Sequence, residues 1–196
     1  DRLSEADMAE ALLRRHGVSL VIGETQASLL RHYDTAAKRL FVNAAAPPES
    51  RRFLIAHQLM RLAAADIIAD IVRAAALPLP GADRLLEVGL ANYAAGALTM
   101  PYIAFRAAAR AARHDIDRLA RHFGVSFEQA CHRLSTLQRP GMRGIPFFFC
   151  RVDMAGNITK RHSATRLQFA RFGGACPLWI VHEAVAIPDR IVTQLG

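Results

Sequence analysis

The sequence predicts an α+β fold, in which a helical part is followed by a smaller region of antiparallel strands. Two observations carry this prediction. Apolar residues recur with a helical period over most of residues 5–137, whereas from Pro146 onward they follow the two-residue period of strands. A shorter strand pattern at 18–43 adds a β component near the N-terminus.

Turn and cap signals divide the first half of the chain. Gly17 stops a first amphipathic helix, and Ser50 is placed to cap a long one. The segment 77–81 (LPLPG) reads as a linker, because two prolines and a glycine interrupt any helix. The predicted elements are a helix over 5–17, a strand over 18–22, a hairpin over 29–43 that turns at Asp34 and Thr35, and a helix from Ser50 to about residue 76.

The second half begins with helices and ends with strands. Ser126 and Gln129 form a capping box, which fixes the start of one helix. The predicted elements are helices over 83–98, from Pro101 onward, over 115–123 and over 126–137, then a hairpin over 146–162 with its loop at 154–157. We divide the chain into residues 1–114 and residues 115–196.

The chain carries a formal net charge of +8, and the excess lies in one stretch. Residues 103–171 hold thirteen Lys or Arg against four Asp or Glu, and nearly all of the basic residues are Arg. Arg makes forked contacts to phosphate, so this stretch favours a nucleic acid or a nucleotide-like ligand. An Arg- and Ala-rich composition is also what a GC-rich genome produces, which leaves a compositional explanation open.

The hydrophobic fraction of 52% is typical of a globular chain. No apolar run approaches the roughly 20 residues needed to span a bilayer. The start of the sequence lacks the basic and apolar regions of a signal peptide. We therefore expect a cytoplasmic protein without a membrane partner, and we expect the chain, which opens on Asp1 without Met, to be a piece of a longer protein.

The stretch 57–61 (HQLMR) has the spacing of a zinc-peptidase motif but lacks its chemistry. HExxH helices place two His ligands on one face, and the Glu between them activates water. Here His57 is present, Gln58 replaces the base and Arg61 replaces the second ligand. Gln58 cannot accept a proton and Arg61 repels a cation, so the sequence predicts a degenerate zinc site without peptidase activity.

The flanks of this stretch resemble the ImmA/IrrE family of bacterial metallopeptidases. Residues 51–57 (RRFLIAH) are similar to the lead-in to the family's zinc motif, and residues 90–101 (LANYAAGALTMP) to its downstream motif. The family's third zinc ligand, a Glu, falls on Leu90. The resemblance implies a zincin-like helical core in which His57 is a hydrogen-bonded core histidine.

The C-terminal half resembles a second family, the short-chain fatty acyl-CoA regulators. The resemblance is carried by long motifs: residues 131–141 (CHRLSTLQRPG), 146–160 (PFFFCRVDMAGNITK), 169–179 (FARFGGACPLW) and 181–184 (VHEA). It implies the ligand-sensing part of a regulator of propionate catabolism and the methylcitrate cycle. In that family a helix-turn-helix domain precedes the IrrE-like part and binds DNA, and such regulators usually form homodimers.

The chain has three cysteines, an odd number without any CxxC, and their spacing alone favours three reduced thiols. The resemblance instead implies a 4Fe–4S cluster held by Cys131, Cys150 and Cys176. A cluster needs converging thiolates, and the fourth ligand stays open between an outside thiol and a histidine. The histidines to consider are His132, His162 and His182.

An acyl-CoA ligand, coenzyme A or propionyl-CoA, requires basic residues for its phosphates and an apolar slot. In a regular strand Phe147, Phe149 and Arg151 share one face, whereas Phe148, Cys150 and Val152 share the other. The candidate ligand-binding residues are Arg143, Arg151, Lys160, Arg161, Arg166, Arg171, Phe169 and Trp179.

Two other functions are considered. Residues 116–137 have the outline of a helix-turn-helix, which would contact DNA directly through Arg121 and Arg133. Cys176 and His182 are close enough in sequence to form a hydrolase pair, but no oxyanion-hole motif accompanies them.

Overall fold

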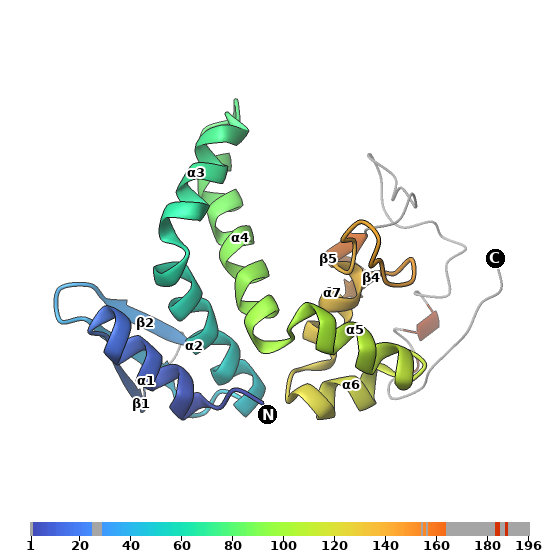
Figure 1. Ribbon diagram of the computed structural model, residues 1–196, viewed down its shortest axis with the longest axis horizontal. Helices are drawn as coiled ribbons and strands as arrows, with labels where there is room; N and C mark the ends of the chain where they lie inside the picture. The colour runs from blue at the N-terminus through green and yellow to red at the C-terminus, as the bar shows by residue number, and fades with distance from the viewer. Residues whose placement is uncertain are drawn as a thin grey trace. The chain divides into compact units, whose positions relative to one another are not determined.

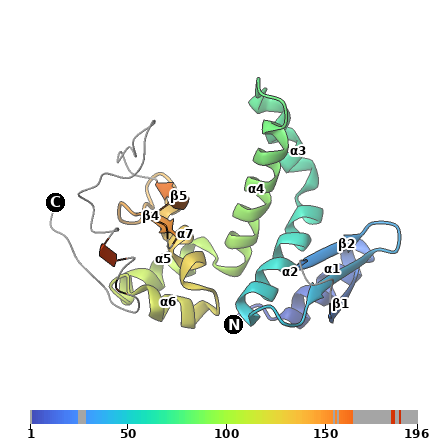
Figure 2. The same ribbon diagram turned by 180° about the vertical axis from the view of Figure 1, so that it is seen from behind.

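The computed structural model describes residues 2–24, 29–153, 155, 157–163, 183–184 and 187, with only the backbone at Arg161 and Ser163. The chain separates into two compact units, Asp1–Ala130 and Cys131–Gly196. The division lies later than the boundary we placed after residue 114. Figures 1 and 2 show the elements of each unit from opposite sides. Within the described part of the chain, no helix has the length and apolar character needed to cross a membrane.

Unit 1 opens with helix α1 (Glu5–His16). Ser4 and Asp7 form a capping box at its start, and Gly17 ends it in the left-handed conformation, with φ of 67°. The helix predicted over 5–17 is therefore confirmed. Met8 and Leu12 lie on its buried face.

A three-stranded sheet follows, in the order β1-β3-β2. Its strands are β1 (Ser19–Gly23), β2 (Arg31–Asp34) and β3 (Arg39–Asn43), with β1 parallel and β2 antiparallel to β3. This confirms the predicted strand and hairpin. Leu40 and Val42 on β3 are fully buried and join the core formed by α1 and α2. One face of the sheet therefore packs against helices.

The long helix predicted from Ser50 to residue 76 is wrong in two respects. Helix α2 (Pro48–Ala63) begins after Pro47 without a side-chain cap, so Ser50 lies inside its first turn. It ends at Ala64, whose φ of −111° leaves the helical region, and α3 (Ala65–Ala75) continues separately. Alanine favours helix, so local preference predicts continuity and only the tertiary structure places the break.

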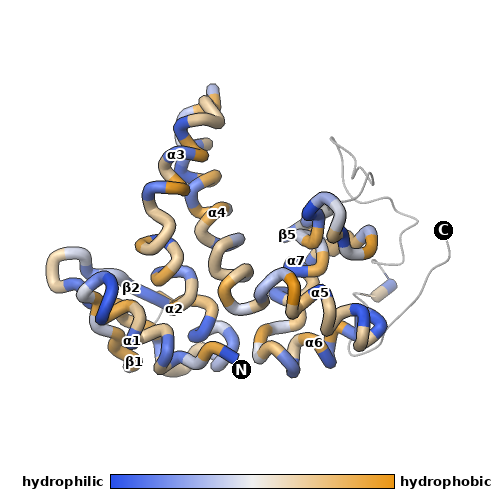
Figure 3. Tube along the Cα trace, in the orientation of Figure 1, coloured by the Kyte–Doolittle hydropathy of each residue, from blue (hydrophilic) through white to orange (hydrophobic). Residues whose placement is uncertain are grey.

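Helix α4 (Ala82–Thr99) packs against both α2 and α3, as Figure 1 shows. Apolar residues continue along α3 and α4 in Figure 3, and some of them, such as Ile67 and Leu85, are exposed. Helix α5 (Tyr102–Ala111) starts after Pro101, which is its N-cap and not its first residue. Helix α6 (Ile116–Phe123) is capped by Asp115 and ends at Gly124.

Arg52 explains why α6 belongs to unit 1. This side chain is 6% exposed and comes from α2. Its guanidinium donates to the carbonyl oxygens of Phe123 at 2.8 Å, Gly124 at 2.6 Å and Leu3 at 3.2 Å. These bonds tie the end of α6 to the start of the chain, a connection that no local sequence pattern reveals.

Helix α7 (Phe127–Ser135) spans the division between the units. The capping box predicted from Ser126 and Gln129 is present, with both of its hydrogen bonds near 3 Å. Unit 2 continues with β4 (Phe148–Val152) and β5 (Ile158–Ser163), an antiparallel pair. Asp153 stabilises the connection by accepting hydrogen bonds from the backbone N–H groups of Ala155 and Asn157. The predicted hairpin is thus confirmed, with β4 starting at Phe148.

Candidate functional site

Helix α2 places the residues of the HExxH-like stretch beside each other. His57 is 6% exposed and Gln58 is 2% exposed, whereas Arg61, one turn later, is exposed. Leu90 lies half-buried on α4, the helix that packs against α2. Three of these four side chains offer neither a carboxylate nor an imidazole, so a metal ion would find one conventional ligand here.

Arg31 on β2 is the main residue that sequence reasoning missed. It pairs with Val42 in the sheet, so its side chain leaves on the face that α2 covers. Its Nη1 donates to Nδ1 of His57 at 2.6 Å and lies 3.4 Å from the carbonyl oxygen of Leu54. A guanidinium has no acceptor atom, so Nδ1 must accept and the imidazole proton must lie on Nε2.

The charges around His57 keep it neutral. Burial, and then the positive charges of Arg31 and Arg61, lower the pKa of His57 from 6.5 to about 4. Burial, and then the charge of Arg61, also lower the pKa of Arg31. Near neutral pH the site therefore holds two guanidinium cations next to an uncharged imidazole.

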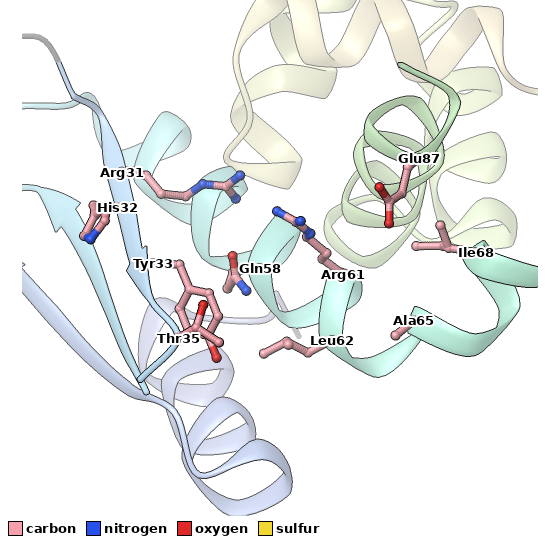
Figure 4. A pocket seen from close by; sticks show the side chains of 10 residues that line it. All are labelled: Arg31, His32, Tyr33, Thr35, Gln58, Arg61, Leu62, Ala65, Ile68 and Glu87. Atoms are coloured by element: carbon pink, nitrogen blue, oxygen red, sulfur yellow. The ribbon is translucent and has the colours of Figure 1, made fainter. Parts of the chain in front are cut away.

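A cavity of about 580 Å³ opens beside this group. In Figure 4 the guanidinium groups of Arg31 and Arg61 point toward one another, with the amide of Gln58 nearby and Glu87 of α4 reaching in from the other side. The cavity lies within unit 1. It is lined by Arg31, His32, Tyr33, Thr35, Gln58, Arg61, Leu62, Ala65, Ile68 and Glu87.

All three cysteines predicted to bind a cluster belong to unit 2, and the structure describes two of them. Cys131 on α7 is buried, and Cys150 on β4 is half-buried. Burial raises the pKa of Cys150. Cys176 lies outside the described residues, which by themselves contain no group of three His, Cys, Asp or Glu arranged to hold a metal. The iron–sulfur cluster stays a prediction.

Two of the histidines considered as a fourth ligand lie together. The rings of His132 on α7 and His162 on β5 are 4.6 Å apart, and Nδ1 of His162 is 2.7 Å from Oγ of Ser135. His162 pairs with Phe149 in the sheet, so both lie on the strand face opposite to Cys150. His182 lies outside the described part of the chain.

The same strand face carries part of the predicted acyl-CoA site. Arg151 pairs with Lys160 across the hairpin, and Nζ of Lys160 lies 5.9 Å from the ring centre of Phe149. Arg143 is exposed in the segment before β4. Arg161 follows Lys160 on β5. The other four candidates, Arg166, Phe169, Arg171 and Trp179, lie outside the described residues.

One of the two arginines predicted to contact DNA through a helix-turn-helix is buried. Arg121 on α6 is exposed, but Arg133 on α7 is 2% exposed and close to the hydroxyl of Thr136. A buried guanidinium cannot reach a phosphate or a base edge. Direct DNA contact through this segment would therefore depend on residues other than Arg133.

Two family models match adjoining parts of the chain. Residues 13–135 match the IrrE N-terminal-like domain, and residues 136–196 match the short-chain fatty acyl coenzyme A regulator C-terminal region. Both resemblances described from the sequence motifs are thereby confirmed.

Three longer proteins are similar to nearly the whole of this chain. The chain is 51% identical over 184 residues to a propionyl-CoA carboxylase regulator of Cereibacter sphaeroides and 48% identical over 193 residues to the HTH-type transcriptional regulator PrpR of Mycobacterium tuberculosis. It is 41% identical to the HTH-type regulator RamB of M. tuberculosis. These three alignments include 94%, 98% and 100% of this chain. They include only 39%, 40% and 42% of the respective relatives, so the chain spans well under half of their length.

A solved structure has the same fold. The chain superposes on a Mycobacterium tuberculosis transcriptional regulator with a TM-score of 0.92 and 48% sequence identity. The match covers 97% of this chain and 58% of that one.

Proposed function

Since the chain belongs to the IrrE-like family and carries the C-terminal region of the short-chain fatty acyl-CoA regulators, we propose that it is the ligand-sensing part of a bacterial transcription regulator. Its proposed ligand is coenzyme A or a short acyl-CoA such as propionyl-CoA. The observation that carries the proposal is the match of residues 136–196 to the acyl-CoA regulator region, together with relatives named as regulators.

The hairpin β4–β5 supports the choice of ligand. Arg151 and Lys160 place two positive charges beside the ring of Phe149 on one strand face. Phosphate groups and an adenine ring require charge and an aromatic surface close together. We expect Arg143 and the candidates from Arg166 to Trp179 to complete this site. Arg161 pairs with Cys150 and therefore belongs to the opposite strand face.

In this proposal another part of the full-length protein binds DNA. The curated relatives are more than twice as long as the chain, and two of them are named as HTH-type regulators. The burial of Arg133 is consistent with this assignment. The proposed full-length protein acts in the cytoplasm as a homodimer that switches transcription of genes for propionate catabolism.

We also propose that the IrrE-like unit has no peptidase activity. Gln58 cannot act as a base, Arg61 repels a cation, and Leu90 provides no ligand atom. His57 adds a further obstacle, because the hydrogen bond from Arg31 to Nδ1 places the imidazole proton on Nε2. Zinc binding through Nε2 would require Nδ1 to carry that proton and Arg31 to move away.

An iron–sulfur cluster held by Cys131, Cys150 and Cys176 is part of the proposal. Of the two described cysteines, Cys131 is buried and Cys150 is half-buried, and thiolates are the ligands that such clusters require. The cluster would supply a redox-responsive centre next to the acyl-CoA region. Because burial raises the pKa of Cys150, cluster binding would displace a proton from this thiol.

Calorimetry with matched charge variants tests the ligand-binding proposal. Propionyl-CoA is titrated into the wild-type chain, into Arg151→Gln and into Arg118→Gln. Both substitutions remove one charge from an exposed arginine, but Arg118 lies on α6 in the other unit. We expect Arg151→Gln to raise Kd about tenfold, the usual effect of losing a charged hydrogen bond, and Arg118→Gln to leave it unchanged. Equal effects of the two variants would contradict a site on β4–β5.

A further inference from the structure

We propose that the cavity beside α2 is an oxyanion-binding site, in which Arg31 and Arg61 hold the carboxylate or phosphate group of an organic ligand. The site lies entirely in unit 1. Its lining includes Gln58 and Arg61, which occupy the positions of the Glu and the second His of the zinc-peptidase motif. It is separate from the acyl-CoA face proposed on β4–β5 in unit 2. Either proposal can therefore fail without the other.

The two guanidinium groups lack a compensating acid. Among the residues that the structure describes, no ion pair within 4.0 Å involves Arg31, Arg61 or Glu87. The two cations point toward one another in Figure 4 and repel each other. Bringing like charges together costs free energy, and an anion between them would remove that cost and accept forked hydrogen bonds from both.

His57 fixes one of these two groups. The hydrogen bond from Nη1 of Arg31 to His57, 2.6 Å long, holds the guanidinium against α2 while its remaining N–H groups stay available for the cavity. The Nη1 contact with the carbonyl oxygen of Leu54 adds a second restraint. Arg31 is therefore oriented before a ligand arrives, which lowers the entropic cost of binding.

The remaining wall separates into a polar part and an apolar part. Tyr33, Thr35 and Gln58 supply hydroxyl and amide groups that can donate to the same oxyanion. Leu62, Ala65 and Ile68 form an apolar side. A volume of about 580 Å³ exceeds what an inorganic ion needs and lies within the range of small-molecule sites. The ligand class is thus an organic molecule with an oxyanion at one end and an apolar portion at the other.

Glu87 sets a limit on the negative charge that the cavity accepts. It reaches in from α4 opposite the two arginines in Figure 4. With Arg31, Arg61 and Glu87 charged, the lining has a net charge of +1, so a single negative charge is balanced. Removing the charge of Glu87 should strengthen oxyanion binding, the opposite of the effect expected for Arg61.

The experiment uses the 196-residue chain with two probes, inorganic phosphate and hexanoate, at constant ionic strength. Binding is followed by the NMR resonances of the His57 imidazole, which contacts Arg31. The variants are Arg61→Gln, Glu87→Gln and, as a matched control, Arg73→Gln. Arg73 is an exposed arginine on α3 that pairs with Asp70 outside the cavity. Since Arg61 is exposed and makes no described ion pair, Arg61→Gln is expected to fold.

Saturable shifts of the His57 resonances with at least one probe are expected. Arg61→Gln should raise Kd about tenfold, Glu87→Gln should lower it, and Arg73→Gln should leave it unchanged. A response to phosphate alone identifies a phosphate ligand, and a response to hexanoate alone identifies a carboxylate. Absence of saturation with both probes, or equal weakening by Arg61→Gln and Arg73→Gln, would overturn the proposal.

Discussion

Arg31 on β2 and His57 on α2 are joined by a 2.6 Å hydrogen bond across 26 residues of sequence. The bond fixes the imidazole as the tautomer with its proton on Nε2, the nitrogen through which zinc would bind, and places a cation against the other ring nitrogen. The same arginine thus closes the site to zinc and contributes to the oxyanion pocket.

The first prediction concerns pH and stability. The pKa of His57 is lowered from 6.5 to about 4, so the unfolded chain binds a proton that the folded chain excludes. The stability that comes from a neutral His57 is fully present above pH 6.5 and is lost as the pH falls toward 4. Because the side chain is 6% exposed, the loss should be on the order of 2–3 kcal/mol.

Urea unfolding at pH 7 and pH 5 measures this loss. The comparison is between the wild type and His57→Gln, which keeps an acceptor for Arg31 but does not titrate. The wild type should lose more stability than the variant on going to pH 5. Identical losses would show that His57 does not titrate in this range.

The second prediction ranks the causes of the His57 shift. Burial is the largest cause, followed by Arg31 and then Arg61. Arg31→Met should therefore raise the pKa of His57 more than Arg61→Met does, and neither should restore it to 6.5. An NMR titration of the His57 ring carbons reports each value. A larger rise in Arg61→Met would contradict the placement of Arg31 against Nδ1.

The third prediction concerns metal. A chain with Gln58→Glu, Arg61→His and Leu90→Glu regains the ligand types of a zinc peptidase. We expect it to bind zinc poorly while Arg31 still donates to Nδ1 of His57, and to bind one zinc ion per chain once Arg31→Leu is added. Zinc content measured after dialysis distinguishes the two variants. Full occupancy in the first would show that Arg31 is no obstacle.

The fourth prediction concerns Arg52. Arg52→Met removes three hydrogen bonds to backbone carbonyl oxygens, including those of Phe123 and Gly124, which would be left with fewer partners. The free energy of unfolding should fall by about 2–4 kcal/mol. Arg73→Met, an exposed site, should change it by less than about 0.5 kcal/mol. Denaturant melts of both variants provide the comparison.

The sequence predicted the elements whose ends carry their own signals. Gly17 stops α1 in the left-handed conformation, and Ser126 with Gln129 starts α7, because these effects act within one helical turn. The break at Ala64 has no such signal, since an alanine run favours an unbroken helix. Its position depends on packing between α2, α3 and α4.

Only part of the candidate site could be predicted from the sequence, again because local patterns are visible there and contacts between distant segments are not. The stretch from His57 to Arg61 is local, so its spacing was visible in the sequence. Arg31 is not local to it, although one signal was available: alternation along β2 places Arg31 and Tyr33 on the same side as Leu40 and Val42 of the partner strand, which is the buried side. An arginine at an inward strand position needs a polar partner, and His57 is that partner.

The measurement that tests the central proposal most directly is the thermal unfolding of the chain with propionyl-CoA and with 3′,5′-adenosine diphosphate at equal concentrations. The second compound carries the adenine, the ribose and two of the three phosphates of coenzyme A without its thiol arm. We predict that propionyl-CoA raises the unfolding temperature in a saturable manner and more than the nucleotide does. Equal shifts, or no shift with propionyl-CoA, would contradict the assignment of this chain as an acyl-CoA sensor.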